Sequence, residues 1–402
     1  MNVLISGASI AGPALAYWLR RYGFGVTVVE RSPELRPGGQ AVDLRGVAKK
    51  VVRRMGLDAE VRAACTDTLG LSYVTKRGWR VASTTVDEHG GDGFVAEIEI
   101  LRGDLARVLY DATSDGVEYL FGDRIVALEQ DADGVTVDFA GGARRRFDLV
   151  IGADGLHSGV RALAFGPESD YLRHLGLYFA FFTVPNRPRL DRWMLGYDAP
   201  GRSCGVRSIH DNADAMAYFA FRSPELDYDP RDAAAQRALV RERITGLGWE
   251  APWLLDRMDE APDFFFDSIA QIHLPEWSNG RVALLGDAAF CPSPMSGQGT
   301  SLAVVGAYVL AGELAQRSGD HAGAFAEYQR RMGDWVTATQ KMGAAHAAAA
   351  SPDSQWAIFR QYLAAWTEHH FPRLARLGGG DGGAALGELV KGIELPDYEP
   401  AH

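Results

Sequence analysis

The chain has 402 residues, of which 47% are hydrophobic, and a formal net charge of −11 at pH 7. This acidic balance argues against a broad surface for nucleic acid or anionic membranes, and no apolar run approaches the roughly 20 residues that a membrane helix needs. The three cysteines are scattered and the ten histidines lack ligand spacing, so neither a disulfide framework nor a metal site is indicated. We therefore expect a cytoplasmic globular protein of two or three domains that binds no metal.

A nucleotide-binding signature opens the chain. Residues 2–6 form an apolar run that predicts a buried parallel strand, and Gly7-Ala8-Ser9-Ile10-Ala11-Gly12 then turns the chain into a helix. In a dinucleotide-binding turn the first glycine allows the tight bend, the second lets the backbone approach a diphosphate, and the third allows close helix packing. Ser9 replaces the second glycine here. The positive end of the helix dipole would still meet the diphosphate charge.

The next strand supports the same interpretation. Residues 26–30 read as a second buried strand, which ends in Glu30. This acid lies about 20 residues beyond the glycines, where such folds place the carboxylate that holds a ribose. A glycine-rich turn without a ligand would explain the glycines, but not the strand–turn–helix–strand order that ends in Glu30.

A second layer is predicted to begin after residue 70. Residues 71–74 and 79–83 have the pattern of a β-hairpin that turns at residues 76–78. Residues 98–110 return to a helical pattern, and residues 147–151 read as another buried strand that ends in a loop.

The middle of the chain differs in style. Residues 171–275 contain short aromatic-rich strands in place of a βαβ rhythm, which predicts an antiparallel sheet with one helix over residues 230–247. After residue 276 the α/β pattern resumes with a strand that leads into Gly286-Asp287.

The last part of the chain is predicted to be helical. A long helix is expected over about residues 300–316, and further helices to about residue 376. Residues 378–383 are a glycine-rich break, and we expect the tail after them to be peripheral.

Three motifs in this order resemble the FAD-dependent aromatic hydroxylases, the single-component flavoprotein monooxygenases typified by para-hydroxybenzoate hydroxylase. The motifs are Gly7 to Gly12 with Glu30, Gly152-Ala153-Asp154-Gly155 with Ser158, Val160 and Arg161, and Gly286-Asp287-Ala288-Ala289 with Pro294 and Gly297-Gln298-Gly299. Residues 39–46 also look like the branch that contains tetracycline-inactivating and polyketide-tailoring monooxygenases. Phe290 departs from the many relatives that carry His or Tyr there, so a polar role of that side chain is absent.

The resemblance implies an α/β fold. A Rossmann-like FAD-binding domain would comprise residues 1–70, 98–170 and 276–350. An inserted, mainly antiparallel β-sheet substrate domain would comprise residues 71–97 and 171–275, and residues 351–402 would form a C-terminal helix and tail.

The resemblance also implies which residues bind FAD. Glu30 would hold the adenosine ribose, and Asp287 would accept a hydroxyl of the ribityl chain. Arg31 and Arg102 would lie beside the nucleotide or flavin, although a surface charge and a helix-start residue are the plain alternatives. The full predicted set is Gly7, Ser9, Gly12, Glu30, Arg31, Asp43, Arg102, Asp154, Asp287, Pro294, Gly297 and Gly299.

Two of these residues have equally plain structural alternatives. Asp43 matches an acid that faces the flavin ring in the tetracycline-inactivating branch, but it also fits a turn. Asp154 belongs to a motif that serves both flavin and pyridine nucleotide in the family, but it also fits a turn cap, as Arg161 fits a structural ion pair.

The expected chemistry belongs to the cofactor, so no catalytic side chain is assigned. NADPH or NADH would reduce FAD, dioxygen would add to it, and a C4a-hydroperoxyflavin would hydroxylate an aromatic or enolic small molecule. Aromatic side chains in the predicted sheet favour a flat, polycyclic substrate, with most of them in the core and a minority in contact with ligand. The candidates for contact with the substrate are Phe179, Phe181, Phe219, Phe221 and His210. His210 fits a surface histidine equally well.

Two other functions compete with hydroxylation. A flavin-dependent halogenase shares the cofactor domain, but Trp193, Trp253 and Trp277 lack the W-x-W-x-I-P pattern of its best-known branch. A non-catalytic flavin- or ligand-binding protein is the third possibility. The sequence leaves open the substrate, its regiochemistry, Baeyer-Villiger oxidation or epoxidation, the choice between NADH and NADPH, and whether the protein is a monomer or a homodimer.

Overall fold

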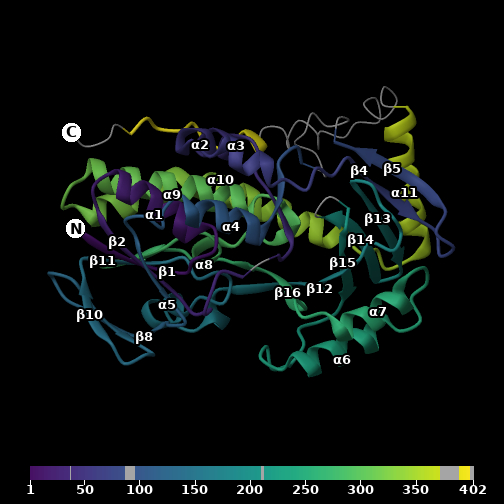
Figure 1. The fold of residues 1–402 in the computed structure, drawn as a ribbon, viewed down its shortest axis with the longest axis horizontal. Helices are drawn as coiled ribbons and strands as arrows, with labels where there is room; N and C mark the ends of the chain where they lie inside the picture. The colour runs from purple at the N-terminus through teal and green to yellow at the C-terminus, as the bar shows by residue number, and fades with distance from the viewer. Residues whose placement is uncertain (37, 87–95, 210–211, 372–388, 399–402) are drawn as a thin grey trace.

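Two β-sheets lie side by side with helices covering them (Figure 1). The computed structural model describes residues 1–36, 38–86, 96–209, 212–371 and 389–398. One sheet has six strands, mostly parallel, and the other has seven strands, mostly antiparallel. This mixed α/β architecture confirms the predicted fold class.

The six-stranded sheet has the strand order β17-β18-β11-β1-β2-β7. Its central strand, β1, pairs in parallel with β2 on one side and with β11 on the other, and β11 pairs in parallel with β18. Val3, Leu4 and Ile5 of β1 are completely buried, as expected for a strand covered on both faces. The strands are β1 (Asn2–Ser6), β2 (Gly25–Glu30), β7 (Glu118–Phe121), β11 (Leu149–Gly152), β17 (Ser278–Asn279) and β18 (Val282–Leu284).

Helices cover one face of this sheet and a small sheet lies on the other side (Figure 1). α1 (Ala11–Arg21) packs on α9 (Gly299–Gln316), which packs in turn on α2 (Val47–Met55) and α10 (His321–Ala349). The other helices near this sheet are α3 (Asp58–Ala63), α4 (Arg102–Asp111), α5 (Gly159–Ala164) and α8 (Asp287–Phe290), with the 3-10 turns η2 (Glu168–Asp170) and η3 (Pro294–Ser296). The small sheet contains β8 (Ile125–Gln130), β9 (Val135–Phe139) and β10 (Arg144–Phe147).

The seven-stranded sheet has the strand order β16-β12-β15-β14-β13-β4-β5. β4 and β5 form the predicted hairpin, and β4 joins the sheet through a parallel pairing with β13. α6 (Ala233–Ile244) and α7 (Ala251–Glu260) pack on one face of the sheet. The strands are β4 (Gly70–Val74), β5 (Arg80–Thr85), β12 (Leu172–Pro185), β13 (Trp193–Ala199), β14 (Arg202–Ile209), β15 (Asp214–Arg222) and β16 (Phe265–Ile272).

The prediction that a helix begins at residue 98 was wrong. Glu99–Leu101 form a strand, β6, which pairs with β3 (Ala41–Asp43), and α4 begins only at Arg102. Ile100 is completely buried in this pair, so tertiary pairing overrides the local helical pattern. The expectation of a single helix between residues 171 and 275 was also incomplete, because α7 follows α6.

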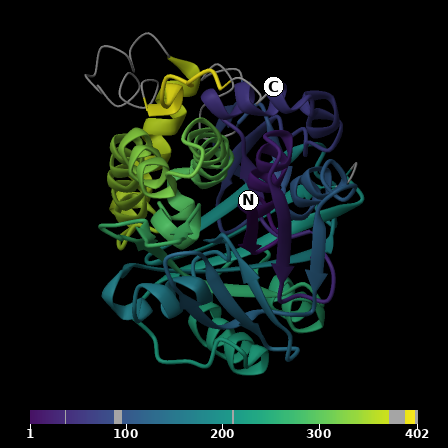
Figure 2. The same ribbon diagram turned by 90° about the vertical axis from the view of Figure 1, so that its left-hand side faces the viewer.

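The C-terminal helices gather on one side of the molecule (Figure 2). α11 (Gln355–His370) lies along β5 at the edge of the seven-stranded sheet (Figure 1). The glycine-rich break at residues 378–383 lies outside the described residues. Within the described part of the chain, no helix is long and apolar enough to span a membrane, and no group of three His, Cys, Asp or Glu side chains is arranged to hold a metal ion.

Candidate cofactor and substrate site

The turn after β1 is as tight as its glycines suggest. Gly7 has a φ of +108°, and a Cβ added there would lie 2.4 Å from the carbonyl oxygen of Ala153. A Cβ added at Gly12 would lie only 1.9 Å from the carbonyl oxygen of Gly7. Both positions therefore require glycine. No side chain of the described residues caps the start of α1, so its first N–H groups can bind an anionic group.

Glu30 lies beside this turn. Its carboxylate accepts hydrogen bonds from the backbone N–H groups of Ala8 and Ser32, both at 2.9 Å. Each carboxylate oxygen can accept more than one hydrogen bond. The two backbone bonds thus fix the orientation of Glu30 and leave it capable of accepting a ribose hydroxyl.

Arg102 connects the turn to the other end of the site. Its Nε donates a 3.0 Å hydrogen bond to Oγ of Ser9, the residue that replaces the second glycine. Desolvation lowers the pKa of Arg102, and the charge of Asp287 acts in the opposite direction. Arg31 and Arg36 contribute to the same electrostatic environment. Positive charge therefore gathers where a diphosphate would meet the head of α1.

Asp287 begins the short helix α8 directly after β18 and Gly286. Its side chain is open to solvent, yet desolvation raises the pKa of its carboxyl, with the Arg102 charge opposing. This combination indicates a side chain that lines a deep hollow, because a carboxylate on a convex surface keeps its hydration. A Cβ added at Gly299 would lie 3.7 Å from Asp287 Oδ1, so the carboxylate also lies at the head of α9.

The loop between α8 and α9 brings backbone to the same hollow. Pro294 begins η3, and Gly297 follows with a φ of +61°. The side-chain carbonyl oxygen of Gln298 is buried and has no hydrogen-bond partner within the described residues. An unpaired buried acceptor is costly, so a donor from a bound group would satisfy it.

Asp43 reaches this loop from β3. A Cβ added at Gly297 would lie 3.4 Å from Asp43 Oδ2. The Asp43 carboxylate pairs with Arg45 at 2.8 Å. Burial raises the pKa of Asp43 to about 6 against the opposing charge of Arg45, and the nearby Glu99 carboxylate contributes to the rise.

The sequence interpretation missed a line of charges next to Asp43. Asp43 and Glu99 lie directly opposite each other in the β3–β6 pair, where two like charges repel. Glu99 is neutralised by Arg207 of β14, with Nη1 to Oε1 at 2.5 Å. The Nε of Arg207 is buried and has no partner among the described residues. Only the spacing of Asp43 and Arg45 could have hinted at this network.

Asp154 and its neighbours form a connected network of their own. The Asp154 carboxylate accepts hydrogen bonds from Oγ of Ser158 at 2.5 Å and from the backbone N–H of Val160 at 3.1 Å. Arg161 is completely buried and donates to Glu168 and to the carbonyl oxygens of Leu156 and Ala288. These contacts show that the motif organises the loop after β11, and any contact of Asp154 with a cofactor stays a prediction.

The four candidate phenylalanines divide between the two faces of the seven-stranded sheet. Phe179 packs near Met295, and Phe181 packs near Leu101, so both face the cofactor side and are only partly buried. Phe219 and Phe221 are almost completely buried on the other face, which α6 and α7 cover. Only the first pair can line a cavity beside the cofactor. His210 lies outside the described residues.

The open helix N-terminus, the two acids and the glycine-rich loop define a site for a long dinucleotide. Its ribose end would lie at Glu30, its diphosphate at the turn and Arg102, and its ring at the loop that follows Asp287. Gly7 and Gly12 allow the tight backbone turn at the head of α1, and the unpaired Gln298 oxygen offers an acceptor. These residues fit FAD.

Comparison with known proteins agrees with this geometry. Residues 1–326 match the family model described as "FAD binding domain". The chain is 41% identical over 343 residues to a "Flavin-dependent monooxygenase" of Legionella longbeachae, covering 85% of this chain and 88% of the relative. It is 32% identical over 427 residues to the "FAD-dependent monooxygenase asL4" of Sarocladium schorii, covering 99% and 98%. The crystal structure of the tetracycline destructase Tet(55) superposes with a TM-score of 0.83 at 39% identity, covering 98% of each chain.

The chain therefore belongs to the FAD-binding-domain family of flavoprotein monooxygenases. It is an FAD-dependent monooxygenase, as the three sequence motifs predicted.

Proposed function

We propose that this enzyme uses NADPH or NADH and dioxygen to hydroxylate an aromatic or enolic, polycyclic small molecule. Bound FAD would supply the redox chemistry by taking a hydride from the nicotinamide and activating dioxygen at its C4a position. The observation that carries the substrate class is the cofactor-facing side of the seven-stranded sheet. This side combines partly buried aromatic rings with a small number of polar groups.

The aromatic part of this surface favours a flat substrate. Phe179 and Phe181 are two residues apart on β12 and therefore lie on the same face of the sheet. Tyr218 of β15 lies opposite Phe181. Their rings form one partly buried row, with centroids of Phe179 and Phe181 5.7 Å apart. Such a row suits a fused ring system, which buries apolar area against it.

The polar part favours an ionisable oxygen on that substrate. Arg207 presents a cation beside this surface, and Asp43 is close enough for the Arg207 charge to lower its pKa. Because burial raises the pKa of Asp43 to about 6, its carboxylate can accept a phenol or enol proton near neutral pH. The Nε–H of Arg207, which has no partner among the described residues, would donate to the oxygen anion left behind. The anion makes the neighbouring carbon more electron-rich.

The relatives support the polycyclic class. One of the similar crystal structures is a tetracycline destructase, whose name gives a polycyclic substrate for that protein. We extend that class to this chain on the strength of the aromatic row and not of the name alone. A cytoplasmic location belongs to the same proposal, because nicotinamide cofactors are supplied there and Cys65, Cys204 and Cys291 are unpaired thiols.

Transient kinetics on the purified holoenzyme tests the proposal. The flavin is reduced anaerobically with NADPH or NADH and then mixed with ¹⁸O-labelled dioxygen in the presence of tetracycline, 1-naphthol or 4-hydroxybenzoate. We expect one labelled oxygen atom in the product of a polycyclic substrate and none in 4-hydroxybenzoate. A bound flavin that neither nicotinamide reduces, with or without these compounds, would contradict the proposal.

The role of Asp43 has a separate readout. Asp43→Asn keeps the shape of the side chain but removes the proton acceptor. We expect the pH profile of flavin reoxidation with a phenolic substrate to lose its step near pH 6, with flavin content unchanged. An unchanged profile would remove Asp43 from the mechanism.

A further inference from the structure

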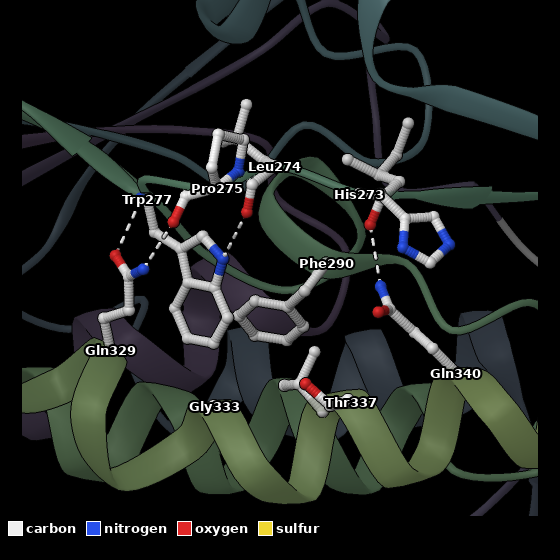
Figure 3. Close-up of a pocket in the computed structure, with 11 residues that line it drawn as sticks. His273, Leu274, Pro275, Trp277, Phe290, Gln329, Gly333, Thr337 and Gln340 are labelled. Atoms are coloured by element: carbon white, nitrogen blue, oxygen red, sulfur yellow. Dashed lines mark hydrogen bonds between the residues drawn. The ribbon is translucent and has the colours of Figure 1, made fainter.

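A second hollow lies between α10 and residues 272–277, which join β16 to β17 (Figure 3). It has a volume of about 410 Å³, within the range of pockets that hold small molecules. None of its lining residues belongs to the cofactor site or to the substrate surface described above. The hollow therefore needs its own explanation.

The apolar part of this hollow includes two aromatic rings beside the side chains of Ile272, Leu274, Pro275 and Val336. Trp277 and Phe290 are in contact, with ring centroids 4.5 Å apart, and both are buried. α10 passes beneath these rings in Figure 3, and its residues Gly333 and Thr337 also line the hollow. A Cβ added at Gly333 would meet no atom within 4 Å, so the missing side chain leaves open space.

The polar part of the hollow has a defined hydrogen-bond polarity. The side-chain amide nitrogen of Gln271 donates to the carbonyl oxygens of Pro292, at 3.0 Å, and Gln340, at 2.7 Å. Its Oε1 therefore faces Nε2 of His273 at 2.9 Å, and that ring nitrogen must carry the proton. Desolvation lowers the pKa of His273, so the ring is neutral at pH 7. Its Nδ1 is then an acceptor, and no partner for it exists among the described residues.

Gln340 supplies a second acceptor. Only 8% of this residue is exposed. Its amide nitrogen donates to the carbonyl oxygen of Ile272 at 2.8 Å, while its Oε1 has no partner in the described part of the chain. Figure 3 shows this oxygen directed toward the space between Phe290 and Thr337. This oxygen still meets solvent, so a ligand N–H or O–H can take the place of water as its donor.

We propose that this hollow binds a planar aromatic molecule that carries an N–H or O–H donor. The ring lies in the space over Gly333 and touches the small exposed edge of Trp277, and the donor bonds to Gln340 Oε1. Charged ligands are disfavoured, because the lining offers a neutral imidazole, amides and a hydroxyl.

The position of the hollow gives such a ligand access to the cofactor loop. Phe290 is the last residue of α8, whose first residue is Asp287. Pro292, which Gln271 holds through its carbonyl oxygen, begins the loop that leads to Gly297. A ligand in this hollow would therefore lie behind the segment whose other end carries Asp287.

Fluorine NMR on the FAD-loaded full chain tests binding at this hollow directly. The tryptophans are replaced with 5-fluorotryptophan, and the Trp277 signal is assigned by its loss in Trp277→Phe. Titration with 2-naphthol should shift this signal saturably. Naphthalene, which lacks the hydroxyl, should bind about 10-fold more weakly, equivalent to about 1.4 kcal/mol, because it leaves Gln340 unpaired.

Two variants of α10 make the result specific. Gly333→Leu fills the open space with a better helix former, so we expect a folded, FAD-loaded protein whose Trp277 signal no longer responds. Asp334→Leu places the same side chain one residue along, at an exposed position outside the lining, and should preserve the response. An unmoved Trp277 signal in the original protein, or an equal shift in Gly333→Leu, would overturn the proposal. The fluorine signal does not require turnover, so this result is independent of the proposed reaction.

Discussion

Asp287 and Arg102 influence each other's pKa across the hollow that we propose as the FAD site, although 185 residues separate them in the chain. The two side chains form no direct ion pair with each other among the described contacts. Desolvation disfavours both charges. In the proposed binding mode, FAD would offer each of them a partner: a phosphate for the arginine and a hydroxyl for the carboxylate. The two residues therefore keep a binding capacity that a closed salt bridge would remove.

Asp287→Ala should weaken FAD binding about 10- to 100-fold, since a hydrogen bond to a charged group contributes about 1.5–3 kcal/mol. The measurement is the dissociation constant of FAD for the apoprotein, followed by flavin fluorescence. Asp115→Ala, which removes an exposed carboxylate on a turn, serves as the control. Normal flavin occupancy in purified Asp287→Ala would place the ribityl chain elsewhere.

Two glycines in helices should respond to alanine in opposite directions. Gly12→Ala would put a Cβ 1.9 Å from the Gly7 carbonyl oxygen, whereas the same change at Gly333 meets nothing within 4 Å. We expect Gly12→Ala to lower the free energy of unfolding by at least about 1–3 kcal/mol, and Gly333→Ala to raise it by about 0.5–1 kcal/mol. Urea unfolding of both variants checks this pair. Equal effects would show that the turn after β1 relaxes without cost.

At the scale of elements, the seven-stranded sheet separates ligand contact from stability. Phe181 faces the cofactor side and is partly buried, while Phe219 is completely buried against α6 and α7. Phe219→Ala should cost about 3–5 kcal/mol of stability. Phe181→Ala should cost less and should raise KM for a polycyclic substrate. Urea unfolding and steady-state kinetics measure the two effects, and a Phe219→Ala protein that keeps full stability but loses substrate affinity would reverse the assignment of the faces.

The same sheet shows how far the sequence could predict the structure. The alternation of side chains along a strand predicts that Phe179 and Phe181 share one face of the sheet, and that Phe219 and Phe221 share one face. It does not predict which face is buried, because that depends on where α6 and α7 pack. The parallel strands of the other sheet could be predicted, because both of their faces are buried and their sequences are therefore continuous apolar runs. β6 could not be predicted, because its three residues form a strand only through their pairing with β3.

The site was predictable where a motif is local and unpredictable where it is not. Gly7, Gly12 and Glu30 lie within one βαβ segment, so their spacing carries the information. Arg207 and Glu99 are distant in sequence and meet only because β14 lies across from β6. No periodicity marks such a pair.

At the scale of the whole molecule, His157 ties the loop after β11 to the seven-stranded sheet. Its ring lies 2.8 Å from Glu168 and 3.2 Å from Asp267 of β16. Hydrogen bonds to Asp267 and Glu168 raise the pKa of His157 to about 10. The imidazolium therefore joins the two halves of the protein at neutral pH.

This tie should make stability depend on pH above neutrality. The pKa of His157 is about 6.5 in the unfolded chain and about 10 in the folded protein. Its contribution is therefore complete below about pH 6.5 and is lost as the pH rises through 10. Between pH 7 and 10 the original protein should lose more stability than His157→Gln, measured by urea unfolding.

His321→Gln provides the control, because desolvation lowers the pKa of His321 and its titration falls below this window. Parallel pH profiles for the original protein and His157→Gln would show that the bridge carries no net stability.

The strand order β17-β18-β11-β1-β2-β7 has a consequence for biosynthesis. The strand in the middle of the sheet leaves the ribosome before every other strand of that sheet, while Asp287 is made about 280 residues later. At about 5–20 residues per second, that delay is roughly 14–56 s. During this time the glycine turn is present but its flavin partners are not, and one edge of β1 is unpaired until β11 emerges. The nascent chain thus carries an apolar strand with one unpaired edge, and the predicted FAD site is complete only after Asp287 has emerged.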